Sequence, residues 1–171
     1  MPLQVSKPED RVWRLITIYG PTGAGKSWFT AGAESKFGGR TLIVGTEGAE
    51  AGLTGFDVDV VRVQSMADLH KILRDLHTDP GPYRNGVLGI DSLSQMSRFA
   101  DAEDAEAEFR KQHTTTPLNI PLDTYKRVGE DIRRAVWVAR TLPMHVILVC
   151  LDRLFTDKND VSIRMIGPNL P

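Results

Sequence analysis

The chain has 171 residues, with 21 basic and 22 acidic side chains and a formal net charge of −1. This length can bury one hydrophobic core, so we expect a single domain over residues 1–171. The balanced charge excludes a strong overall field that attracts nucleic acid, so any such contact must be local. Cys150 alone cannot form an internal disulfide, and no apolar run approaches the ~20 residues that cross a bilayer. With no apolar signal core at the N-terminus, these features favour a cytoplasmic protein without membrane contact.

Predicted strands and helices alternate along the chain. In chain order they are a strand at 13–19, a helix at 26–36, strands at 41–45 and 58–63, a helix after Ser65, a strand at 86–91, a helix at 122–141, a strand at 146–151 and a hairpin with arms at 153–156 and 161–165. β-branched and aromatic residues mark the strands, and apolar residues at three-to-four spacing mark the helices. The alternation predicts an α/β fold whose mostly parallel sheet has helices on both faces.

Two elements carry sharper local signals. Asp59 and Arg62 interrupt the 58–63 strand, which predicts a place at the edge of the sheet. Ser65 and Asp68 have the spacing of a capping box, so a helix should begin there. Its apolar residues then share one face: Met66, Leu69, Leu73 and Leu76. A long insertion, residues 94–121, separates the 86–91 strand from the last helix.

A glycine-rich loop lies between the first predicted strand and the first predicted helix. Its residues are Gly20, Pro21, Thr22, Gly23, Ala24, Gly25, Lys26 and Ser27. This is the G-x-x-x-x-G-K-[ST] pattern in the context that phosphate binding requires. The glycines let backbone N–H groups point at phosphates, which indicates a nucleotide site and leaves the base open. ATP is the ligand of the leading hypothesis, with Lys26 at its β- and γ-phosphates and Ser27 holding Mg²⁺. The alternative is a glycine turn that only joins strand to helix.

Asp91 ends the apolar 86–91 strand. A carboxylate at this point would hold the same magnesium ion as Ser27. The alternative is an Asp that caps the following helix. The pattern is weak alone and gains its weight from the phosphate loop upstream.

Hydrolysis also needs a carboxylate that orients the attacking water. In many ring ATPases of the AAA type this base directly follows the metal-binding Asp, but here that residue is Ser92. Glu47 follows the 41–45 strand, whose carboxyl end should face the same crevice as the phosphate loop. Glu47 and Lys26 are therefore the predicted catalytic residues. Glu50 as the base, or an ordinary surface turn, are the alternatives.

The order of these motifs resembles the RecA-type recombination ATPases. The similar features are Thr46-Glu47-Gly48 after the second strand, Ile90-Asp91-Ser92 at the third core strand, and a long insertion before the 146–151 strand. Within that superfamily, the chain looks most like small bacteriophage nucleotide-binding proteins implicated in single-strand annealing and recombination. The resemblance covers most of residues 13–171 and implies a RecA-like P-loop NTPase core.

The resemblance carries further implications. Glu47 would activate water, the 146–151 strand would insert between the 13–19 and 86–91 strands, and subunits would assemble side by side with nucleotide at the seam. Single-stranded DNA would bind through loops after Asp91, and a phage-encoded protein would act in the host cytoplasm. The resemblance also implies further strands after residue 171, so a truncated chain is one expectation and a shorter natural chain is the alternative. Members of the family usually carry a polar residue near the end of the fourth core strand, where it senses the γ-phosphate. Asp152 and Arg153 are the weak candidates for this residue here.

The charged segments leave the DNA contacts open. The insertion begins with acidic residues that repel phosphate and continues with basic ones that attract it, so a solvated helix with a mobile tip at 114–117 is the plainer interpretation. Basic residues of the last helix could pair with acids, line a subunit seam or touch DNA: Lys126, Arg127, Arg133, Arg134 and Arg140. Lys158 and Arg153 are candidates for a cation that reaches a neighbour's nucleotide, although a plain turn lysine is the simpler account.

These features together predict a magnesium-dependent RecA-like ATPase whose hydrolysis is coupled to assembly on single-stranded DNA. One alternative is a P-loop phosphotransferase, against which the acidic start of the insertion argues because such kinases use an arginine-rich lid. Another alternative is a non-catalytic, nucleotide-gated assembly protein.

Overall fold

The computed structural model describes residues 13–46, 52–96, 122–156 and 162–168. Its strands are β1 (Leu15–Gly20), β2 (Thr41–Gly45), β3 (Asp59–Arg62), β4 (Val87–Asp91), β5 (His145–Thr156) and β6 (Ser162–Pro168). Its helices are α1 (Lys26–Ala31), α2 (Glu34–Phe37), α3 (Met66–Thr78), the 3-10 helix η3 (Gly81–Tyr83) and α5 (Leu122–Arg140). The alternation of strands and helices confirms the predicted α/β class.

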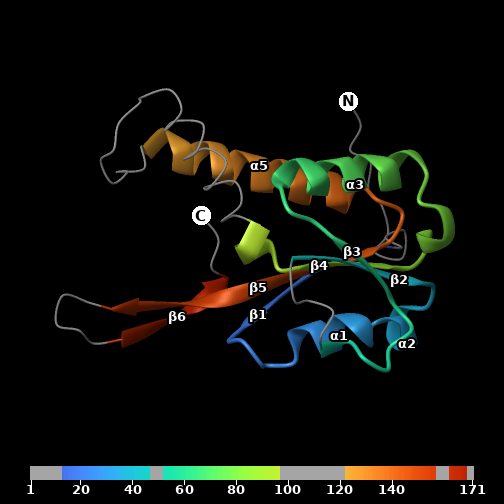
Figure 1. The fold of residues 1–171 in the computed structure, drawn as a ribbon, viewed down its shortest axis with the longest axis horizontal. Helices are drawn as coiled ribbons and strands as arrows, with labels where there is room; N and C mark the ends of the chain where they lie inside the picture. Colours follow the sequence, from blue (N-terminus) through green and yellow to red (C-terminus); the bar gives the residue numbers. More distant parts are fainter. Residues whose placement is uncertain (1–12, 47–51, 97–121, 157–161, 169–171) are drawn as a thin grey trace, which may run out of the picture.

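Five strands of the described sheet run parallel in the order β1-β5-β4-β2-β3. β5 therefore lies between β1 and β4, as the resemblance implied, and β3 lies at the edge, as its charged residues predicted. β6 pairs antiparallel with β5 and extends away from the sheet as the C-terminal hairpin (Figure 1). This topology is that of a P-loop NTPase core.

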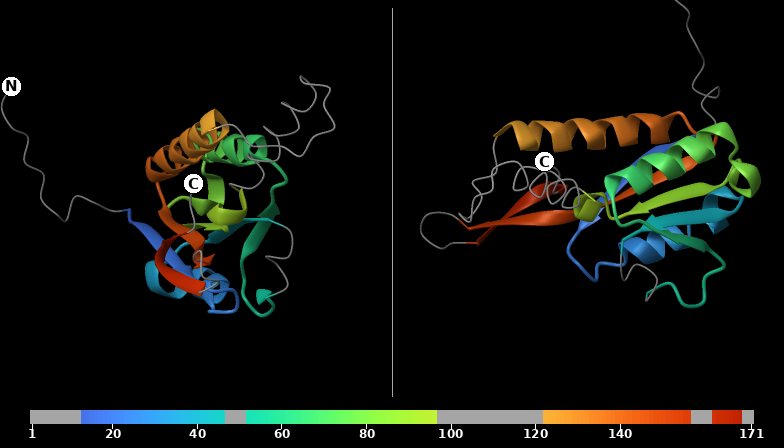
Figure 2. Two further views of the ribbon diagram at one scale, coloured as in Figure 1. Left: turned by 90° about the vertical axis from the view of Figure 1, so that its left-hand side faces the viewer. Right: turned by 45° about the horizontal axis from the view of Figure 1, so that its top comes forward.

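Helices cover both faces of the sheet. α3 and α5 lie side by side on one face, and α1 and α2 lie on the other (Figures 1 and 2). β2 is buried along its whole length, and β4 is buried up to Asp91, because side chains on both faces meet a helical layer. The larger core cluster lies under α3 and α5, and includes Leu69, Leu73 and Ile132.

The helix predicted over residues 26–36 is two helices, which is a correction to the sequence analysis. The amide of Ala33 donates to the Thr30 carbonyl at 3.2 Å, and the amide of Ser35 donates to the Gly32 carbonyl at 3.3 Å. These three-residue turns replace the four-residue spacing of an α-helix. The Ser35 hydroxyl also donates to the Gly32 carbonyl at 2.7 Å, and this local hydrogen bond stabilises the break between the two helices. Gly32, where the break lies, has a low helix propensity.

β5 is longer than predicted. The strand expected at 146–151 and the hairpin arm expected at 153–156 are one continuous 12-residue strand. Its pairing with β6 shifts register between Asp152 and Arg153. Such an irregularity bends a strand, which is how one strand serves both the parallel sheet and the antiparallel hairpin.

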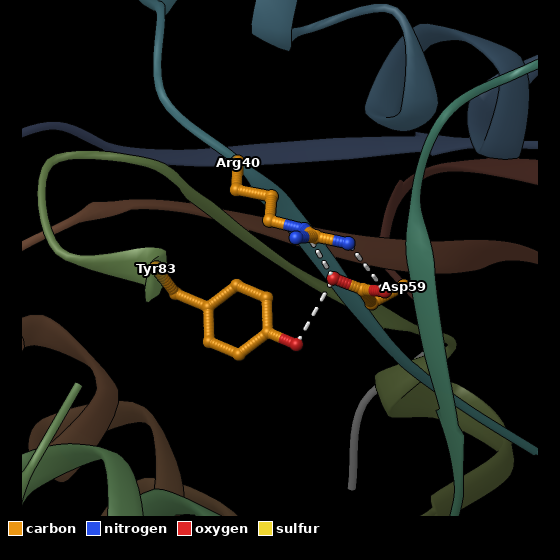
Figure 3. Close-up of polar contacts among 3 residues, drawn as sticks. All are labelled: Arg40, Asp59 and Tyr83. Carbon is orange, nitrogen blue, oxygen red and sulfur yellow. Dashed lines mark hydrogen bonds and ion pairs between the residues drawn. The ribbon is translucent and has the colours of Figure 1, made fainter. Parts of the chain in front are cut away.

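A polar cluster joins the amino ends of three neighbouring strands (Figure 3). Arg40, directly before β2, pairs with Asp59 at the start of β3, with 2.7 Å between Nε and Oδ2. The Tyr83 hydroxyl, from the 3-10 helix before β4, donates to the same Asp59 oxygen at 3.0 Å. Burial and the contact with Asp59 raise the pKa of Tyr83. This cluster secures the edge strand β3 at the end of the sheet opposite to the phosphate loop.

Candidate functional site

A cavity of about 530 Å³ opens at the carboxyl ends of the parallel strands. Its lining comes from the phosphate loop, the start of α1, the segment after β2, the end of β4 with the turn after it, and the middle of β5. The lining residues are Thr22, Gly23, Gly25, Lys26, Ser27, Trp28, Thr46, Gly52, Asp91, Ser92, Gln95 and Leu151. Ligands of open α/β sheets bind at this edge, because the loops that follow parallel strands converge there. The fold thus brings most of the predicted loop, and Asp91, to one hollow.

The conformation of the phosphate loop depends on two of its glycines. Gly23 and Gly25 have φ values of 81° and 80°, in the left-handed region that other residues rarely adopt. A Cβ atom at either position would meet nothing within 4 Å, so the requirement is backbone conformation and not space. The amide of Phe29 donates to the Gly25 carbonyl at 2.9 Å, so α1 starts directly at the cavity.

Lys26 folds back along the loop. Its ammonium group donates to the Gly20 carbonyl at 2.8 Å and to the Pro21 carbonyl at 2.7 Å. Gly20, Pro21 and Ala24 do not themselves line the cavity, and the first two contribute by holding this cation. A positive charge therefore sits at the cavity wall, ready for an anionic ligand.

Ser27 and Asp91 meet across 64 residues of sequence. The Ser27 hydroxyl donates to the Asp91 carboxylate, which brings the first turn of α1 to the end of β4. A hydroxyl oxygen and a carboxylate oxygen are ligands that suit Mg²⁺, which completes its shell with water and phosphate oxygens. Among the described residues no three His, Cys, Asp or Glu side chains gather into a metal site. The donor set here fits a magnesium ion held jointly with a phosphate ligand.

Thr46 and Gln95 also line the cavity, and the sequence analysis named neither as a site residue. The Thr46 amide donates to the Asp91 carbonyl at 3.2 Å, and its hydroxyl donates to the Gln95 side-chain oxygen. The Gln95 amide donates to the Ser92 carbonyl at 3.0 Å, so a tight turn after β4 returns Gln95 to the site. The available signal was a polar residue one helical turn beyond the strand that ends at Asp91.

The other predicted site residues have different outcomes. Glu47, its alternative Glu50, and Lys158 lie outside the described residues. Asp152 and Arg153 lie at the register shift of β5. Residues 94–96, the start of the predicted insertion, are helical, and Ser94 accepts a hydrogen bond from the Leu151 amide at 3.0 Å. The rest of the insertion is outside the described part of the chain.

Cys150 lies on β5 next to the cavity wall and is fully buried. Burial raises the pKa of its thiol to about 11, against a smaller lowering effect of Ser94 and Lys26. The thiol is therefore protonated at neutral pH, and a protonated buried thiol is a poor nucleophile. Cys150 serves the core of the sheet and not the chemistry of the site.

The phosphate loop between β1 and α1, with Asp91 at the end of a neighbouring strand, defines a P-loop NTPase. The sequence model of the AAA domain matches residues 14–168, and the chain belongs to this family. No curated protein matches the chain. Membership in the family implies nucleotide binding in the cavity. None of the described helices is long and apolar enough to cross a membrane.

Proposed function

We propose that the chain is a RecA-type ATPase that binds ATP with Mg²⁺ and hydrolyses it. The observation that carries the proposal is the contact between Ser27 and Asp91 beside the Lys26 ammonium, on one cavity wall. That arrangement supplies a cation for the phosphates and two oxygen ligands for a metal. Both are requirements of phosphoryl transfer, in which positioning and electrostatics do most of the work.

The binding roles follow from the chemistry of each side chain. Lys26 exchanges the two loop carbonyls for the β- and γ-phosphate oxygens of the nucleotide. Ser27 and Asp91 hold the magnesium ion, which supplies neutralisation of the charge that develops on the phosphates. Gly23 and Gly25 keep the loop in the conformation that surrounds an anion.

Glu47 is the proposed general base. It directly follows Thr46, which lines the cavity, and the end of β2 at Gly45 pairs with Asp91. Ser92 occupies the position after Asp91, but it offers a hydroxyl group and is only 3% exposed. A serine cannot take the proton of water as a carboxylate does, which favours Glu47 for that role.

The biological half of the proposal is action in phage DNA recombination and single-strand annealing. The order of the motifs supports it, together with a strand interposed between β1 and β4 as in the RecA-type arrangement that the sequence resembles. In this proposal the protein is a homo-oligomer with ATP at the subunit seam, and single-stranded DNA is its partner.

Release of phosphate from ATP, with Mg²⁺ and with or without single-stranded DNA, tests this function. We expect DNA to stimulate release, and Glu47→Gln to abolish it while ATP binding persists. Glu34→Gln, on α2 and away from the cavity, is the matched control and should keep full activity.

Two outcomes would contradict the proposal. Transfer of the γ-phosphate to an added nucleoside would make the protein a phosphotransferase. Tight ATP binding without turnover, in the presence of DNA, would make it a nucleotide-gated assembly protein.

A further inference from the structure

We infer that Trp28 is the platform on which the nucleobase stacks, so that this site binds a nucleoside triphosphate through its base as well as its phosphates. The inference rests on the proposed function, because it assumes that a nucleotide occupies the cavity. It goes beyond that function in naming the residue that recognises the aromatic part of the ligand.

Trp28 lies beside the phosphate-binding residues. It directly follows Ser27 in the first turn of α1 and lines the same cavity as Lys26. Its side chain is nevertheless 61% exposed, an unusual state for so large an apolar group. The indole therefore presents open apolar surface within reach of the phosphate-binding residues.

The indole has a fixed neighbour on one side. The ring of Phe56 lies 5.3 Å from the Trp28 ring, centroid to centroid, with an angle of 81° between the planes. Phe56 packs against the buried cluster that contains Ile43 and Leu53, so the core anchors it. A Cβ atom at Gly32, one turn after Trp28, would lie 3.8 Å from Phe56 Cε1, which is ordinary van der Waals contact, so the Phe56 ring packs close to this turn of α1. Although it has this perpendicular neighbour, Trp28 remains 61% exposed, so much of its surface is open to a ligand.

The composition of the cavity wall favours a nucleobase as the group that contacts the Trp28 indole. Its described residues near the loop are glycines, hydroxyl side chains, Lys26 and Asp91, all suited to phosphate and metal. Among the described lining residues Trp28 alone is aromatic. Every nucleobase has a flat π-face, and stacking on an aromatic side chain stabilises it without requiring a particular hydrogen-bond pattern.

Phe29 is the natural comparison. It is the next residue on α1 and is 54% exposed, but it does not line the cavity. If exposure of any aromatic residue on this helix were enough, the two positions would be equivalent. The inference requires that only Trp28 contributes to nucleotide affinity.

Calorimetric binding of two ligands to the full chain tests the inference. One ligand is ATP and the other is inorganic tripolyphosphate, both with Mg²⁺. Trp28→Ala should weaken ATP binding by roughly tenfold to a hundredfold, the range that loss of one base stack produces, and leave tripolyphosphate binding unchanged. Trp28→Phe should retain most of the ATP affinity, and Phe29→Ala should retain all of it.

Three results would overturn the inference. The first is ATP affinity that is unchanged in Trp28→Ala, which would leave the indole for another occupant such as a second copy of the chain. The second is an equal loss for tripolyphosphate, which would mean damage to the phosphate loop. The third is a wild-type chain that binds tripolyphosphate as tightly as ATP. A chain that binds neither ligand overturns the proposed function too, whereas ATP binding without hydrolysis contradicts only the proposed ATPase.

Discussion

At the scale of single residues, the site is organised by charge. The Lys26 ammonium donates to two carbonyl groups, and no carboxylate of the described residues pairs with it, so its charge remains available to a ligand. Asp91 has a hydroxyl partner in Ser27. A cation and an anion thus face one cavity without neutralising each other directly. This separation allows one to bind phosphate and the other to bind a metal.

Removal of the Lys26 charge should strongly weaken nucleotide binding. Charge-assisted hydrogen bonds contribute about 1.5–3 kcal/mol each. Lys26→Ala should therefore lower the affinity for ATP by about a hundredfold or more. Equilibrium binding of ATP measures the effect. Lys71→Ala, on α3, where the lysine pairs with Asp75 at the exposed surface, is the control. Unchanged affinity in Lys26→Ala would contradict the assignment of the loop.

Asp91→Asn should separate metal binding from nucleotide binding. The amide retains an acceptor for the Ser27 hydroxyl but loses the negative charge that attracts Mg²⁺. A titration of Mg²⁺ at fixed ATP should show a half-saturation shifted upward by about tenfold, the effect of roughly 1.4 kcal/mol. Asp75→Asn should not shift it. An unshifted titration in Asp91→Asn would argue against Asp91 as a metal ligand.

At the scale of elements, the site depends on how closely α1 approaches the sheet. A Cβ atom at Gly89, in the middle of β4, would lie 2.3 Å from the Thr30 Cγ2 atom. Real atoms do not approach so closely, so the glycine lets α1 pack directly on β4. Because α1 carries Ser27 and β4 carries Asp91, the same approach brings the two predicted metal ligands together.

Gly89→Ala should therefore destabilise the fold by about 1–3 kcal/mol, the usual cost of overpacking. Thr30→Ser should recover part of this loss, because it removes Cγ2 and keeps the hydroxyl that donates to the Lys26 carbonyl at 3.0 Å. Chemical denaturation of the two single variants and the double variant measures the coupling. Purely additive free energies of unfolding would contradict this account of the packing.

At the scale of the whole molecule, two histidines of lowered pKa link the stability of the fold to pH. His145 stacks on Phe37 and accepts a hydrogen bond from the Arg14 amide at 3.3 Å. Burial lowers the pKa of His145, and the nearby Arg14 adds to this. Burial also lowers the pKa of His70 on α3, where Arg134 and Arg74 act in the same direction and Asp131 opposes them.

The lowered pKa values of His70 and His145 predict a loss of folding stability in mild acid. The unfolded chain takes up protons near the ordinary histidine pKa of 6.5, whereas the folded chain resists until a lower pH. The melting temperature should therefore decline as the pH falls below about 6.5. His70→Leu and His145→Asn should flatten this decline, and His77→Gln, on the exposed side of α3, should not. A wild-type slope in both His70→Leu and His145→Asn would contradict the prediction.

Much of the fold could be predicted because strong local patterns decided it. Ser65 caps α3 as predicted, accepting from the Asp68 amide at 3.0 Å, and the apolar residues of that helix are buried. The break after α1 could not be predicted in the same way. It depends on the Ser35 hydroxyl and on three-residue turns, features that leave no periodic pattern in the chain.

The sequence by itself determined the phosphate loop and the acidic end of β4, because spacing along a strand–loop–helix unit fixes which groups face a phosphate. Only the tertiary structure decided that Thr46 and Gln95 belong to the same cavity as the phosphate loop. Their positions follow from the order of parallel strands and from turns that return the chain to the sheet edge. These are contacts between distant segments, and they arise from packing that no local pattern encodes.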